Sequence, residues 1–127
     1  MERPQDTGAS TQEANVDGLT LEYSDRGAGE PVLLIHGGLC TALLDPLLDE
    51  PALGAHRLIA HHRAGYAGSS HPWDAGSLSD HARHCRELLR HLGVERAHVI
   101  GHSSGANIAL QLAFDAPKAV HSLALLE

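Results

Sequence analysis

The sequence predicts an α/β fold, a mostly parallel sheet with flanking helices. Short apolar segments that suit strands alternate along the chain with segments that suit helices, the pattern of repeated βαβ units. Glycine-rich loops directly follow some of the apolar segments, and in parallel sheets functional groups gather at these carboxyl ends of strands. With 127 residues, the chain is long enough for one domain with one core.

Five segments are predicted to be strands: 19–23, 32–35, 57–60, 97–100 and 120–126. The first alternates between apolar and polar residues, as a half-exposed strand does. The second is a continuous aliphatic run, which suits a strand buried on both faces. Because only a turn at 25–29 separates these two, we expect them to form a hairpin that feeds a central strand.

Three segments are predicted to be helices. A short helix is expected at 42–49, ending before Pro51. Leucine, alanine and cysteine recur at three- and four-residue steps from Leu78 to Leu92, and Ser77 with Asp80 resembles a capping box. The third helix, 106–114, is almost wholly apolar and stops before a proline.

Composition limits the partners and the location of the protein. Residues 1–14 are polar and are expected to be a disordered leader, which leaves 15–127 as the domain. A net charge of −7 argues against a nucleic-acid partner. No apolar run approaches the roughly 20 residues that span a membrane. With Cys40 and Cys85 expected to be reduced thiols, we expect a cytoplasmic protein.

The motif that carries chemistry is the pentapeptide 101–105, Gly-His-Ser-Ser-Gly, which matches G-x-S-x-G. It lies between the predicted strand 97–100 and the predicted helix 106–114, the strand–turn–helix context of a nucleophile elbow. At such a turn the serine hydroxyl stands above the sheet, and glycines let neighbouring backbones approach. Ser103 is therefore predicted to be a nucleophile rather than an ordinary helix N-cap.

Two backbone groups are predicted to bind an oxyanion. The N–H of Ser104 belongs to the first turn of the following helix, whose N-terminus favours developing negative charge. The loop after the central strand offers the N–H of Gly38 as a second donor. His36, Gly37 and His102 are expected to line the pocket, with His36 structural rather than a base.

Four segments together resemble the α/β-hydrolase superfamily: 32–38, 62–70, 98–106 and 122–127. They occur in family order with family-like spacing, and the second resembles the family's Arg-Gly-x-Gly-x-Ser loop, a structural support beside the site. The resemblance implies a hydrolase that acts on an ester or similar acyl bond of a small-molecule substrate, through an acyl-serine and without a cofactor. Serine at the elbow disfavours epoxide hydrolysis and dehalogenation, while carbon–carbon bond hydrolases remain open.

The resemblance covers only the first part of that fold. In the family the triad acid and then the histidine follow the nucleophile, whereas this chain stops at Glu127. We therefore expect a truncated fold that lacks the C-terminal strands and cap, and that self-associates or binds a complementing C-terminal fragment. A non-catalytic remnant or binding module is the alternative. Glu127 is a candidate for the triad acid, because some relatives place it after this strand, or else a terminal residue without a role.

Eleven histidines raise the question of a metal site. His81, His84 and His91 share a face of the predicted helix, but no carboxylate or cysteine stands in a recognised metal-binding spacing with them. We therefore expect a solvated face there and no metal site. His71, in a loop, stays open as a candidate for the triad base.

Overall fold

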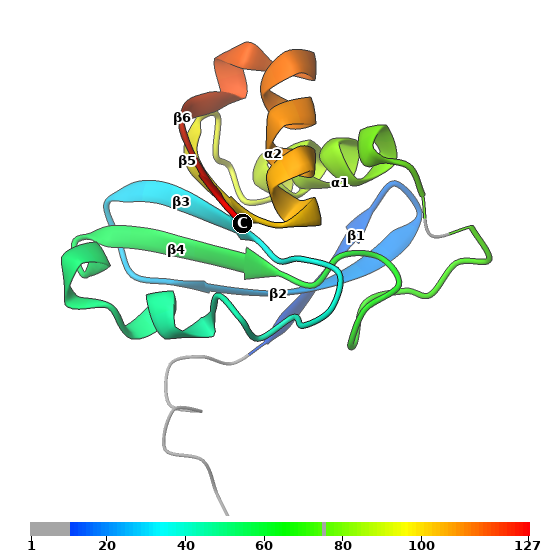
Figure 1. The fold of residues 1–127 in the computed structure, drawn as a ribbon, viewed down its shortest axis with the longest axis horizontal. Helices are drawn as coiled ribbons and strands as arrows, with labels where there is room; N and C mark the ends of the chain where they lie inside the picture. Colours follow the sequence, from blue (N-terminus) through cyan, green and yellow to red (C-terminus); the bar gives the residue numbers. More distant parts are fainter. Residues whose placement is uncertain (1–10, 75) are drawn as a thin grey trace, which may run out of the picture.

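The computed structural model describes residues 11–74 and 76–127, which form one six-stranded sheet (Figure 1). The strands are β1 (Gln12–Val16), β2 (Leu19–Arg26), β3 (Glu30–Ile35), β4 (His56–His61), β5 (Ala97–His102) and β6 (Val120–Leu126). Their order across the sheet is β1-β2-β4-β3-β5-β6. The last four in this order are parallel, while β2 pairs antiparallel with both β1 and β4. This confirms the predicted fold class, a mostly parallel sheet with flanking helices.

Helices cover the sheet unequally (Figure 1). Both α1 (Leu78–His91) and α2 (Ser104–Asp115) lie on one face, where they enclose the larger apolar core with Leu33, Ile35 and Val99. On the other face the short 3-10 helices η2 (Asp45–Asp49) and η3 (Pro51–Leu53) cover a smaller cluster around Val32 and Leu34. The turn η4 (Pro117–Ala119) links α2 to β6. No helix in the described part of the chain is long and apolar enough to cross a membrane.

The amphipathic helix α1 is bounded as its sequence predicts. The Ser77 side chain accepts a hydrogen bond from the Asp80 N–H at 3.2 Å, and the Asp80 carboxylate accepts one from the Ser77 N–H at 3.0 Å. These two bonds complete the capping box and satisfy two N–H groups that the helix itself cannot. Gly93, one residue beyond the C-cap, has a φ of +73°, a conformation that favours glycine.

The hairpin predicted between the segments 19–23 and 32–35, which lie in β2 and β3, is wrong. β2 pairs with β1 and β4, and β4 lies between β2 and β3. The true hairpin is β1–β2, closed by Asp17 and Gly18, which have φ values of +56° and +79°. Positive φ at both central residues is the two-residue turn that Asp-Gly favours, so the sequence did carry this signal.

The predicted limits of two other segments also change. Residues 12–14 belong to β1 rather than to a disordered leader, and Ala14 is buried in the core, because β1 extends the sheet beside β2. Residues 1–10 of that predicted leader lie outside the described residues. The short helix predicted at 42–49 is a 3-10 helix at Asp45–Asp49.

Candidate active site

Ser103 stands at the sharp turn between β5 and α2. Its φ of 56° and ψ of −119° are strained for a residue with a side chain, and its side chain is exposed. The Ser103 N–H donates to the carbonyl of Leu126 at 2.8 Å, which ties the turn to the end of β6. The geometry is therefore that of a side chain held out of the sheet on a fixed backbone.

The two glycines of the motif are required by close backbone contacts. A Cβ on Gly101 would lie 2.7 Å from the carbonyl carbon of Gly105. A Cβ on Gly105 would lie 2.6 Å from the carbonyl oxygen of His36. Real Cβ atoms do not approach so closely. Gly101 therefore lets the chain turn sharply from β5 into α2, and Gly105 lets α2 lie against the end of β3.

The loop after β3 lies directly beside this turn. A Cβ on Gly37 would be 3.1 Å from the Cβ of Ser103, and one on Gly38 would be 3.6 Å from the Oγ of Ser104. The structure thus brings together the residues that the sequence assigned to the oxyanion site and pocket. Ser104 is the first residue of α2, where backbone N–H groups have no intrahelical acceptor.

His36 anchors this loop as a neutral imidazole. Its Nδ1 lies 2.7 Å from the carbonyl oxygen of Gly37, and its Nε2 lies 2.9 Å from the N–H of Arg63. An Nδ1–H that donates to Gly37 and an Nε2 that accepts from Arg63 satisfy both ring nitrogens. Burial lowers the pKa of His36 to about 4, which keeps the ring neutral. In this geometry the ring of His36 ties the loop after β3 to Arg63, and its structural role stays a prediction.

Arg63 connects the loop to the nucleophile turn, and the sequence did not single it out. Its Nη1 donates to the carbonyl of His36 at 2.9 Å and to the Oγ of Ser104 at 3.0 Å. Its guanidinium also lies 4.8 Å from the centroid of the Tyr66 ring. Burial lowers the pKa of Arg63. Its place in the segment that resembles Arg-Gly-x-Gly-x-Ser is the signal that could have identified it.

The acid and the base of a triad remain predictions. Glu127 is exposed and directly follows Leu126, whose backbone contacts Ser103. The Nε2 of His71 lies 3.0 Å from the carbonyl of Ala67 in its own loop. Within residues 11–74 and 76–127, no hydrogen bond joins a histidine to the hydroxyl of Ser103.

The expected solvated histidine face of α1 is wrong for two of its three members. His81 and His84 are only 6% and 4% exposed, whereas His91 is exposed. Position 81 lies four residues before the buried Cys85 and seven before Leu88, so helical periodicity places it on the core side. Desolvation lowers the pKa of His81 to about 4 and also lowers that of His84. Both rings are therefore neutral core residues.

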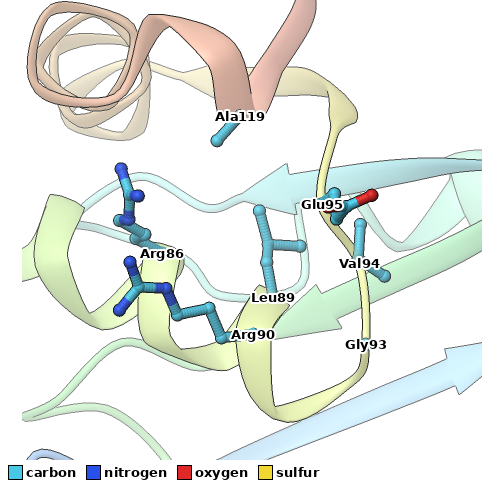
Figure 2. A pocket seen from close by; sticks show the side chains of 7 residues that line it. All are labelled: Arg86, Leu89, Arg90, Gly93, Val94, Glu95 and Ala119. Atoms are coloured by element: carbon cyan, nitrogen blue, oxygen red, sulfur yellow. The ribbon is translucent and has the colours of Figure 1, made fainter.

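Two pockets among the described residues differ in size and in their place relative to Ser103. An open pocket of about 400 Å³ is lined by residues of α1, by Gly93–Glu95 and by Ala119 (Figure 2). It lies beside the segment that enters β5, at the opposite end of that strand from Ser103. The second cavity, beside His36 and His62, has about 20 Å³, the space of a single water molecule. The larger pocket is therefore unrelated to the nucleophile.

Known proteins resemble this chain in both sequence and fold. A family model described as alpha/beta hydrolase fold matches residues 30–127. The chain is 39% identical to the dihydrolipoyllysine-residue acetyltransferase component of the acetoin cleaving system of Cupriavidus necator, over 95% of this chain and 33% of that protein. It is 34% identical to 2-hydroxymuconate semialdehyde hydrolase of Pseudomonas sp. (strain CF600), over 99% of this chain and 46% of that protein.

A solved structure shows the same likeness in three dimensions. Cfl2 from Burkholderia cenocepacia superimposes with a TM-score of 0.88 and 27% identity, over 98% of this chain and 43% of that chain. The chain thus spans from about a third to just under half of the length of these three proteins. The family model covers most of the chain, including the nucleophile turn and the loop beside it. The chain belongs to the alpha/beta hydrolase fold family.

Proposed function

We propose that this protein hydrolyses an ester or similar acyl bond of a small molecule through an acyl intermediate on Ser103. The observation that carries the proposal is the backbone of Ser103, which is held at a φ of 56° between a buried strand and a helix N-terminus. Such strain persists only where the surrounding structure enforces it, and it clusters at functional sites. The relative named 2-hydroxymuconate semialdehyde hydrolase supports a hydrolytic reaction.

In the proposed reaction, the Oγ of Ser103 attacks the acyl carbonyl carbon while a general base takes the hydroxyl proton. The N–H groups of Gly38 and Ser104 stabilise the negative charge that develops on the carbonyl oxygen. The alcohol or equivalent group leaves with a proton, and water then releases the acid from the acyl-serine. Arg63 serves this step indirectly, because it holds the two oxyanion segments in register through His36 and Ser104.

A second candidate, a non-catalytic binding module, is favoured by one observation. In the described part of the chain, no histidine is hydrogen-bonded to the hydroxyl of Ser103. A serine without its base loses most of its activation, although an oxyanion site alone leaves residual catalysis of about 10³–10⁴ over water. Turnover therefore requires a base that the described residues do not place at Ser103.

The test is active-site labelling of the longest expressible form of the protein. A fluorophosphonate probe should form one adduct, mapped by mass spectrometry to Ser103, and Ser103→Ala should abolish it. The matched control is Ser79→Ala, an exposed serine on α1, which should label like the parent protein. Equal labelling of the Ser103→Ala variant would exclude the proposed nucleophile.

Turnover of p-nitrophenyl acetate by the same preparations separates the two candidates. An acyl hydrolase should lose about 10⁴-fold or more of its kcat in Ser103→Ala, because nucleophile and base act as a unit. A binding module should show the same low turnover with or without Ser103.

A further inference from the structure

Two histidines and a glutamate meet at the amino ends of three adjacent strands. Glu30 opens β3, His98 is the second residue of β5, and His121 is the second residue of β6. One ligand atom from each of these residues, a carboxylate oxygen or a ring nitrogen, lies within 4.8 Å of the other two. The three positions are far apart in the sequence, so the sheet alone creates the cluster.

The register of the sheet explains why the three side chains share one side. Val32 pairs with His98, and Glu30 is two residues before Val32, so Glu30 and His98 project from the same face. His98 in turn pairs with Ser122, whereas Ala97 pairs with Val120, so the register shifts by one residue here. The extra residue is His121, and its ring packs edge-on against His98 with centroids 4.5 Å apart. Such irregularities re-aim a side chain.

His98 is held in an orientation that suits a metal ligand. Its Nδ1 lies 2.6 Å from the Oγ of Ser122, and its Nε2 lies 3.2 Å from the Oε1 of Glu30. Histidine ligands characteristically use one ring nitrogen for the metal and give the other a hydrogen-bond partner, which fixes the tautomer. A tetrahedral ion with ligands at about 2.0–2.1 Å separates two ligand atoms by about 3.3 Å. The separation of 3.2 Å between Nε2 of His98 and Oε1 of Glu30 is close to this value.

We infer that Glu30, His98 and His121 form a binding site for a divalent transition-metal ion, with Zn²⁺ as the best match. Two imidazoles and one carboxylate are a donor set that zinc uses, with water in the fourth position. The site is separate from the proposed active site, because His98 lies near the amino end of β5 and Ser103 follows its carboxyl end. A bound ion would cross-link β3, β5 and β6.

The experiment is a zinc titration of the full chain, in a Cys40→Ser background that removes the exposed thiol as a competing ligand. Competition with a chromophoric chelator should give one saturable site. His121→Ala and Glu30→Gln should each weaken zinc binding by about 100-fold or more, and Ser122→Ala should weaken it by about tenfold through His98. The matched control, His91→Ala, removes an exposed histidine on α1 and should leave the affinity unchanged.

Two further measurements, of visible absorption with Co²⁺ and of Tm with Zn²⁺, test the same site. Co²⁺ should replace Zn²⁺ and give the visible absorption of a tetrahedral site, which Glu30→Gln should abolish while its circular dichroism spectrum matches the parent. Zinc should also raise the Tm of the parent chain but not that of Glu30→Gln. Equal zinc affinity in the parent, His121→Ala and Glu30→Gln, or an equal loss in His91→Ala, would overturn the inference.

Discussion

At the scale of single residues, burial decides what each histidine can do. His36, His61 and His81 are 3–6% exposed, and desolvation lowers the pKa of each well below its usual range. His98 and His121, nearer the surface, stand where a cation can reach them. The sequence alone does not distinguish these groups, because burial depends on which strands and helices pack together.

The buried histidines predict that the protein loses stability in mild acid. His61 is buried beside Cys85, and desolvation lowers its pKa to about 3, against about 6.5 in an unfolded chain. Between these values the unfolded chain binds more protons, so the free energy of unfolding falls as the pH falls from about 6.5. One such histidine contributes a loss of about 2 kcal/mol at about pH 5.

Urea unfolding at about pH 7.5 and about pH 5 measures this loss. His61→Leu, which removes one buried imidazole, should lose about 2 kcal/mol less than the parent between the two pH values. The control His71→Leu removes an exposed loop histidine and should lose as much as the parent. If the His61→Leu variant and the parent lose the same free energy of unfolding between the two pH values, His61 does not stay neutral in the folded protein.

At the scale of elements, local signals fixed the helices better than the strand pairing. The limits of α1 follow from its capping box at one end and from Gly93 at the other, and each of these signals is short-range in the sequence. The pairing of β2 with β4 joins Tyr23 to His61 and depends on how the chain returns after β3. A hairpin expectation based on neighbouring segments therefore failed, because no local pattern encodes that return.

The capping box of α1 carries a stability prediction of its own. Ser77→Ala removes the acceptor for the Asp80 N–H, and the loss of such a cap costs about 1 kcal/mol of unfolding free energy. Ser79→Ala, also in the first turn and exposed, is the matched control and should change stability by less than about 0.5 kcal/mol. Urea midpoints of the two variants and the parent test this, and equal midpoints would show that the cap contributes nothing.

At the scale of the whole molecule, the family architecture was predictable because its motifs are local. The pentapeptide 101–105 placed the nucleophile turn, and the aliphatic runs gave the central strands. The segment 62–70 carries a local signal for Arg63, but its contact with Ser104 was not predictable from local pattern, because that contact spans 41 positions. The cluster of Glu30, His98 and His121 was not predicted from the sequence for the same reason, because metal-binding motifs are recognised by short spacings and these residues are far apart in the chain.

The strand β6 lies at the edge of the sheet. Within the described residues it pairs only with β5, and Leu123, Leu125 and Leu126 are 36%, 44% and 42% exposed. A free strand edge with apolar side chains offers unpaired N–H and C=O groups to other chains. We therefore predict that residues 1–127 by themselves self-associate, or bind a partner that supplies a further strand.

Sedimentation of purified residues 1–127 over a concentration series tests this prediction. The average mass should rise with concentration, because pairing along β6 buries the exposed leucines and satisfies backbone groups at the edge. Leu125→Lys places a charge on that edge and should shift the chain toward monomer. Leu110→Lys is the matched control, since Leu110 is 42% exposed on α2, and it should associate like the parent. A parent chain that remains monomeric at every concentration would show that β6 is stable as an open edge. Equal effects of Leu125→Lys and Leu110→Lys would mean that the added charge, and not strand pairing, controls association.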